Sequence, residues 1–317
     1  MENLFFSLKC VLPLFVLISV GYLLRRRGLI SGDFVSVGSN IVFKLALPVQ
    51  LFLQMAGSAL STSFNPSLIL FALVSNFLLV AILWVTVPRL VPGRASQGAV
   101  IQGLFRGNFA LLGVPLAINI FGQEGAAPAS MLLAIVIPFY NVMAVVVLTI
   151  FSEDNESEKK IPLKKIFLRI AKNPLIIGIL LGALWQLGGL PLPEAFVKCL
   201  TPIAQLTTPL ALICLGGQFS FQVARNNLRI SLPVTILKLA GIPAVMLSVA
   251  VWLGFRGTEL GAVFVLYSAP TAVSSYVMAK NMGSDDDLAA QILVFTTIFS
   301  SVSLLLILTV LKGLGLV

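Results

Sequence analysis

The sequence contains no histidine and very few charged residues. Of its 317 residues, 10% are charged and 58% are hydrophobic, whereas a soluble domain carries about 25% charged residues. A soluble chain could not cover its surface with so few charges, and the composition also excludes disordered, collagen-like and disulfide-rich secreted proteins. The mean hydropathy of +1.03 agrees with this conclusion. We therefore predict an all-α polytopic membrane protein.

The missing histidine excludes any histidine-based metal site or proton relay. Cys10, Cys199 and Cys214 lie far apart in apolar stretches without a metal-binding spacing, so we interpret them as small core residues. We predict no metal site and no catalytic residue. The net charge of +9 does not indicate nucleic-acid binding, because the cations are scattered over short loops.

Ten segments are long and apolar enough to cross a bilayer, which requires about 20 residues. The first apolar run is followed by arginines at 25–27 and not by a small-residue cleavage site, so we expect a membrane helix there and no cleaved signal peptide. The ten segments are 4–24, 38–56, 67–88, 98–121, 128–151, 173–188, 196–219, 230–254, 260–280 and 288–312.

The distribution of cations predicts the orientation of these segments. If the N-terminus is outside, 14 of the 21 Lys and Arg residues fall on the cytoplasmic side, 3 fall outside and 4 lie within segments. Positive charge concentrates on the cytoplasmic side of membrane proteins. We therefore expect both termini outside and the central loop in the cytoplasm.

A single long hydrophilic stretch, 152–172, separates two sets of five segments. An odd number of segments in each half gives the halves opposite orientations, which is the geometry of an inverted repeat. The Gly-Ala-Val that opens the fourth segment at 98–100 is echoed at 261–263 in the ninth. We predict a first repeat at 1–155, a cytoplasmic linker at 156–172 and a second repeat at 173–317.

The fourth and ninth segments are poor continuous helices. The fourth contains Gly107 and Pro115, and the ninth contains Pro270 followed by several hydroxyl residues. Glycine costs about 1 kcal/mol in a helix interior and proline about 3 kcal/mol, and unwound backbone at membrane depth must be buried in protein or line a cavity. A matched pair of breaks favours a transporter site, where half-helix N-termini offer N–H groups to an anion, over ordinary proline kinks.

Two cations lie deep within the predicted segments, and no acid does. Arg106 and Lys238 are each eight residues into their segments, while all twelve acids lie in loops or at segment ends. The cations either snorkel to the membrane surface or attract an anionic ligand, and the sequence leaves both explanations open. Three neutral polar residues close to the first break, Asn108, Tyr140 and Asn141, are further site candidates.

Two motifs resemble the auxin efflux carrier family. They are NFALLGVPLAINIFG, from Asn108 to Gly122, and APTAVSSYVMAK, from Ala269 to Lys280. The resemblance covers the whole chain and implies ten helices in two inverted five-helix repeats, similar to sodium–bile acid symporters. It further implies that helices 4 and 9 are broken and cross. Helices 1, 2, 6 and 7 would form a scaffold that dimerises, and helices 3–5 and 8–10 would move as an elevator.

The resemblance also implies a substrate class. The family carries organic anions, which are auxin in plants and malonate- or malate-like carboxylates in bacteria, and the short central loop resembles bacterial members in the cell (inner) membrane. By resemblance, Pro115 is the crossover proline and Asn108 a substrate-contacting amide; Ser275 stands where plant carriers have a second crossover proline. The predicted substrate-binding residues are Arg106, Asn108, Pro115, Tyr140, Asn141, Lys238, Pro270, Thr271, Ser274 and Ser275.

Our leading hypothesis is a secondary transporter, an efflux carrier, of a small organic carboxylate anion. It would be a homodimer in the bilayer, with no enzyme activity and no cofactor. A non-transporting sensor on the same scaffold and a channel are alternatives, as is an intramembrane prenyltransferase that uses Asp285, Asp286 and Asp287 to hold Mg²⁺–diphosphate. Coupling to sodium or to the membrane potential stays open, whereas the absence of mid-membrane acids disfavours a carboxylate proton carrier.

Overall fold

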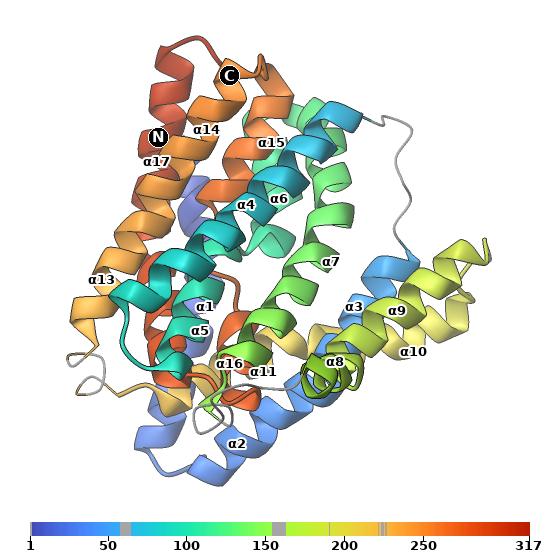
Figure 1. The fold of residues 1–317 in the computed structure, drawn as a ribbon, viewed down its shortest axis with the longest axis vertical. Helices are drawn as coiled ribbons and strands as arrows, with labels where there is room; N and C mark the ends of the chain where they lie inside the picture. Colours follow the sequence, from blue (N-terminus) through green and yellow to red (C-terminus); the bar gives the residue numbers. More distant parts are fainter. Residues whose placement is uncertain are drawn as a thin grey trace.

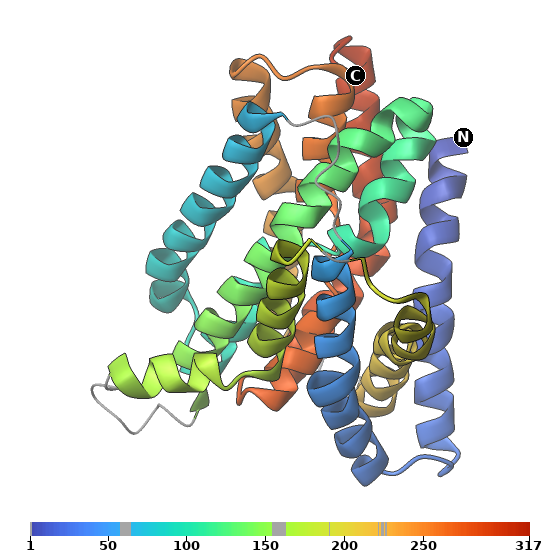
Figure 2. The same ribbon diagram turned by 90° about the vertical axis from the view of Figure 1, so that its right-hand side faces the viewer.

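The computed structural model describes residues 2–57, 65–153, 163–189, 191–220, 222, 225 and 227–317. Across these residues the chain is helical and forms no β-strand (Figure 1). The predicted all-α class is therefore confirmed. The two ends of the chain lie at the same end of the molecule (Figures 1 and 2).

Each of the first five predicted segments coincides with a helix or with consecutive helices. The fourth is divided in two. The elements are α1 (Glu2–Arg26), α2 (Gly32–Ile41), the π-helical turn η1 (Val42–Ala46), α3 (Leu47–Ala56), α4 (Pro66–Leu90), α5 (Arg94–Phe105), α6 (Phe109–Phe121), the 3₁₀ turn η2 (Gly122–Gly125) and α7 (Ala126–Ile150).

The second half begins with a short helix inside the predicted linker, and its other helices again coincide with predicted segments. The ninth segment is divided in two. The elements are α8 (Leu163–Ala171), α9 (Pro174–Leu187), α10 (Glu194–Gln205), α11 (Thr207–Gln218), α13 (Leu228–Ile236), the π-helical turn η4 (Leu237–Gly241), α14 (Ile242–Trp252), α15 (Gly257–Ser268), α16 (Ser274–Asn281) and α17 (Asp286–Gly313).

Within the described residues, six helical stretches are long and apolar enough to cross a membrane, so this is a multi-pass membrane protein. The number of ten spans and the inverted repeat stay predictions, as do the domain limits. The six stretches are Gly32–Ala56, Pro66–Leu90, Phe109–Ile150, Glu194–Gln218, Leu228–Trp252 and Asp286–Gly313.

Local sequence signals explain several helix starts. The side chain of Asn65 accepts a hydrogen bond from the Leu68 amide at 3.2 Å, and that of Asn173 accepts one from Leu175 at 2.9 Å. In both cases the next residue is a proline at the first helical position. Such a cap satisfies a backbone donor that the helix leaves unpaired, and proline there has no donor to lose. These signals fix where α4 and α9 begin.

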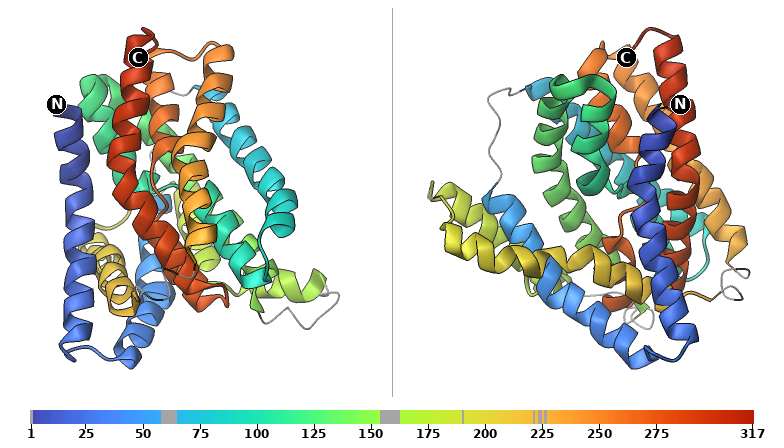
Figure 3. Two further views of the ribbon diagram at one scale, coloured as in Figure 1. Left: turned by 90° about the vertical axis from the view of Figure 1, so that its left-hand side faces the viewer. Right: turned by 180° about the vertical axis from the view of Figure 1, so that it is seen from behind.

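Glycines allow two helix pairs to pack unusually closely. A Cβ atom at Gly216 of α11 would collide with the backbone of Ile18 in α1, and one at Gly178 of α9 would collide with the backbone of Pro48 in α3. Membrane helices associate mainly through such close packing at small residues. Helix α1 also packs beside α17 (Figure 3). Helix α10 contacts both α3 and α11, so the α1–α11 and α3–α9 pairs form one group of helices, and α16 packs against α11 of this group.

Candidate functional site

The two interrupted helices meet at their breaks. Arg106, Gly107 and Asn108 separate α5 from α6, and residues 269–273 separate α15 from α16. Gly107 and Thr271 form an isolated antiparallel bridge. The Asn108 amide donates to the Pro270 carbonyl at 2.6 Å, and the Ala272 amide donates to the Arg106 carbonyl at 3.1 Å. Each break therefore supplies hydrogen-bond partners to the other.

Hydrogen bonds that involve the hydroxyl groups of Thr271 and Thr296 also hold the second break in place. The Thr271 hydroxyl donates to the Gly103 carbonyl at 2.8 Å, and the Thr271 amide donates to the Thr296 hydroxyl at 3.2 Å. Unpaired backbone groups at this depth would each cost several kcal/mol. These contacts hold the unwound chain in place without a ligand.

The helices that follow the two breaks begin without a side-chain cap. The cap position of α6 is Asn108 and that of α16 is Val273, and neither side chain accepts a hydrogen bond from its helix. The first amides of a helix have no partner within the helix, and a helix N-terminus carries about half a positive charge. Two such N-termini contribute to one pocket.

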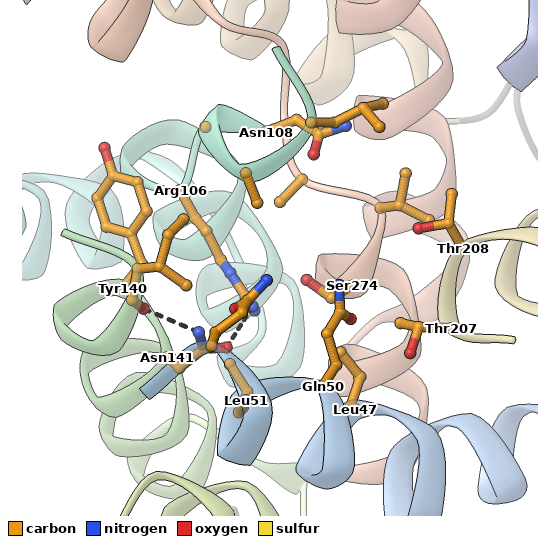
Figure 4. Close-up of a pocket in the computed structure, with 17 residues that line it drawn as sticks. Leu47, Gln50, Leu51, Arg106, Asn108, Tyr140, Asn141, Thr207, Thr208 and Ser274 are labelled. Carbon is orange, nitrogen blue, oxygen red and sulfur yellow. Dashed lines mark hydrogen bonds between the residues drawn. The ribbon is translucent and has the colours of Figure 1, made fainter. Parts of the chain in front are cut away.

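This pocket has a volume of about 110 Å³ and lies where the broken helices face α3, α7 and α11. In Figure 4, Arg106, Tyr140 and Asn141 lie on one side of it, and Thr207, Thr208 and Ser274 lie on the other. The lining residues are Leu47, Gln50, Leu51, Gln54, Arg106, Gly107, Asn108, Ala110, Leu111, Ile137, Tyr140, Asn141, Thr207, Thr208, Ala272, Val273 and Ser274.

Arg106 is the charged group of the pocket and is only 4% exposed. Its Nη2 donates to Asn141 Oδ1 at 2.6 Å, and its Nη1 contacts the Met278 sulfur. Asn141 is oriented by the hydrogen bond from its own Nδ2 to the Ile137 carbonyl at 2.8 Å. In the part of the chain that the structure describes, no carboxylate forms an ion pair with Arg106. A buried cation without a carboxylate partner among the described residues favours an anionic ligand.

The structure brings half of the predicted site residues together. Arg106, Asn108, Tyr140, Asn141 and Ser274 all line the pocket, although they come from three different helical regions. The Tyr140 hydroxyl is buried and has no hydrogen-bond partner among the described residues. The pocket thus contains both a cation and unsatisfied polar groups.

The other five predicted residues do not line it. Pro270 and Thr271 belong to the second break and hold the crossing through their bonds to Asn108 and to Gly103 of α5. Ser275 is buried just beyond Ser274. Pro115 is exposed inside α6, seven residues past the break, and Lys238 is buried in η4 outside the pocket.

Four polar pocket residues were missed by the sequence reasoning. Gln50 and Gln54 project from α3, and Thr207 and Thr208 stand at the start of α11. The glutamines are spaced i and i+4 in an otherwise apolar helix, so they share a face. That spacing was a usable signal for a polar lining.

The acidic cluster at the start of α17 has structural partners. Asp285 accepts hydrogen bonds from the Leu288 amide at 2.9 Å and from the Ser96 hydroxyl at 2.7 Å. Asp286 accepts from Gln218 at 2.6 Å and from Lys280 at 2.8 Å. These contacts account for Asp285 as a helix cap and for Asp286 as part of an inter-helix network.

Sequence comparison identifies the relatives of this chain. It matches the membrane transport protein family over residues 6–308. It is 27% identical over 305 residues to an uncharacterized transporter of Methanothermobacter thermautotrophicus, covering 94% of this chain and 96% of that one. It is 24% identical over 300 residues to an uncharacterized transporter of Methanocaldococcus jannaschii, covering 92% and 94%. The chain therefore belongs to the membrane transport protein family, which is the auxin efflux carrier family that its motifs resemble.

Proposed function

We propose that the protein is a secondary transporter of a small organic carboxylate anion, which binds between the N-termini of α6 and α16. One observation carries the proposal: two uncapped helix N-termini and a buried arginine without a carboxylate partner among the described residues converge on one pocket. Each of these features favours negative charge. Together they give an anion site at the depth where the helices are broken.

The pocket suits a small ligand. Its volume of about 110 Å³ is well below the roughly 300–1,000 Å³ of pockets for drug-sized molecules. A carboxylate there can accept hydrogen bonds from the free amides of α6 and α16, from the Asn108 amide group and from the Ser274 hydroxyl. A hydrogen bond to a charged group contributes about 1.5–3 kcal/mol. Arg106 adds the countercharge that selects an anion over a neutral molecule.

The position of the pocket supports an elevator motion. Gln50 and Thr207 belong to the helix group held by the α1–α11 and α3–α9 pairs, whereas Arg106, Asn108 and Ser274 belong to the broken helices. A ligand held by the second group would be released when that group slides along the first. We propose that these groups are the scaffold and transport parts of two inverted five-helix repeats, and that the scaffold forms a homodimer.

A polar network joins the two groups at the end opposite the termini. Gln218 of α11 accepts hydrogen bonds from Tyr276 at 2.7 Å and Lys280 at 2.5 Å, and it donates to Asp286 at 2.6 Å and Asp287 at 3.1 Å. An elevator motion must break these four bonds. The network therefore stabilises the conformation in which it forms.

Direction and coupling follow from the charge of the substrate. We propose efflux across the cell membrane with both termini outside, driven by the membrane potential, which supplies about 2.3 kcal/mol per charge per 100 mV. No cofactor takes part. Transport currents measured with and without sodium, at two pH values, separate this coupling from sodium or proton coupling.

Uptake into proteoliposomes tests the proposal, with a panel of radiolabelled mono- and dicarboxylates. The wild type should accumulate at least one of them, and Asn108→Ala and Arg106→Ala should not. Asn76→Ala is the matched control, because Asn76 is a buried amide that bonds to Tyr267 at 2.9 Å and does not line the pocket. Wild-type rates in both pocket variants would show that the site is wrong. Binding without uptake of any carboxylate would favour the sensor.

A further inference from the structure

Helix α8 lies inside the stretch predicted to be a plain cytoplasmic linker. It connects α7 to α9, packs against both and runs across the direction of the long helices (Figure 2). It lies toward the end of the molecule opposite the two termini. Ile170 packs against the core, whereas Phe167 is 73% exposed and Leu168 is 51% exposed. The apolar side of α8 is therefore only partly covered by the protein, and the Phe167 ring extends beyond that cover.

The charges of α8 are all of one sign. Its sequence, Leu163–Ala171, is LKKIFLRIA, and Lys172 follows directly. Lys164 and Lys172 are exposed and Arg169 is half-buried. At 100° per residue, Phe167 and Ile170 point to one side, while Arg169 and Lys172 point to the other. Basic residues opposite an aromatic-bearing apolar face are typical of helices that lie in the plane of a membrane surface.

A polar cavity opens beside this helix. Its volume is about 430 Å³, and no acid lines it among the described residues. Arg169 and Asn173 contribute from the α8–α9 side, and Asn281 contributes from the end of α16. Thr149, Ser152, Met282 and Gly283 complete the lining. The Asn281 amide group already donates to the Ser39 and Val277 carbonyls, and the Asn173 amide group to the Met282 sulfur. The guanidinium of Arg169 is therefore the group of this cavity that best suits a phosphate.

We propose that α8 is a membrane-surface helix that binds an anionic phospholipid, with the headgroup phosphate beside Arg169 at this cavity. Phe167 inserts among the acyl chains, and Lys164 and Lys172 attract the negatively charged surface. The exposed aromatic commits the site to a lipid, since a free phosphate would leave Phe167 in water. Because α8 joins α7 to α9 and the cavity reaches the end of α16, the lipid contacts both groups of helices.

Native mass spectrometry of the purified protein tests this inference with no measurement of transport. Phosphatidylglycerol and phosphatidylcholine with identical acyl chains are titrated in separate samples. The double variant Lys164→Gln/Arg169→Gln is compared with Arg26→Gln/Arg27→Gln, which removes two exposed cations from the end of α1. Each lost contact between a cation of α8 and the bound anionic headgroup lowers the affinity by about five-fold, whereas Arg26 and Arg27 do not line the cavity. The α8 variant should therefore bind phosphatidylglycerol about thirty-fold more weakly, and the α1 variant should bind like the wild type.

Three results would overturn the inference. The first is equal binding of both lipids by the wild type, and the second is an equal loss in the two double variants. The third is complete displacement of the lipid by inorganic phosphate, which would mark a free-phosphate site. Phe167→Asn provides a separate check, because it keeps every cation and should still lower retention of the lipid several-fold. All variants should elute at the wild-type position in size-exclusion chromatography, since the changed side chains lie at or near the surface.

Discussion

Replacing Arg106 with glutamine should impair substrate binding without harming the fold. The guanidinium is 4% exposed and, within the described residues, bonds to Asn141 and Met278 and to no carboxylate. Losing a charge-assisted hydrogen bond to the anion costs about 1.5–3 kcal/mol, which raises KM by about 10- to 150-fold. Removing a cation from mid-membrane also lowers the insertion cost by about 2.5–3.5 kcal/mol. The variant should therefore be at least as heat-stable as the wild type.

Two measurements on the same preparations check this prediction. Initial uptake rates in proteoliposomes over a range of substrate concentrations give KM, and thermal unfolding in detergent gives Tm. Arg106→Lys is the matched control, because it keeps the charge but loses the planar fork, so its KM should be intermediate. A KM for Arg106→Gln within two-fold of wild type would refute the role of the charge. A large fall in Tm would show that Arg106 is structural.

Three further variants test other parts of the structure. Gln218→Leu removes four hydrogen bonds between the helix groups, at about 1 kcal/mol each. It should therefore lower Tm and change the uptake rate. Unchanged values of both would show that the network does not stabilise this conformation. Gly216→Leu places a side chain against the backbone of Ile18 and should abolish the folded protein in size-exclusion chromatography, whereas Gly313→Ala, which meets open space, should be tolerated. Lys238→Met should raise Tm, since the buried ammonium makes no hydrogen bond in the described part of the chain and costs about 2.5–3.5 kcal/mol to insert; a lower Tm would contradict this.

The existence of two breaks was predictable because glycine and proline act locally. The exact position of the first break was harder to predict. Pro115 is accommodated inside α6, and the chain unwinds at Arg106–Asn108 instead. Packing between the two broken segments determines the place of this break. A Cβ atom at Gly107 would lie 3.2 Å from the Leu266 carbonyl oxygen, so glycine allows the two segments to approach each other closely. The sequence indicates which segment is broken, while contact with the second broken segment determines at which residues the helix unwinds.

The pocket could be predicted only on the side of the broken helices. Asn108, Arg106 and Asn141 follow from their depth and their nearness to the break. The spacing of Gln50 and Gln54 indicates a polar face on α3. Which neighbour that face meets depends on how α3 packs, and the same holds for Thr207 on α11. Lys238 shows the converse, since its depth was predicted but η4 turns it away from the pocket. A single sequence indicates how deep a residue lies in the membrane, but it does not indicate which helix faces contact one another.

Helix α8 was overlooked for a different reason. Its dense positive charge is typical of a solvated loop. The apolar residues at 166, 167 and 170 nevertheless have helical spacing. A search for amphipathic periodicity within charged linkers would have found it.

A cryo-EM structure determined with the transported carboxylate at saturating concentration tests the central claim most directly. We predict density in the pocket between Asn108 and Ser274, with the carboxylate within hydrogen-bond distance of the first amides of α6 and α16 and of Arg106. Ligand density elsewhere in the protein, with this pocket empty, would contradict the account.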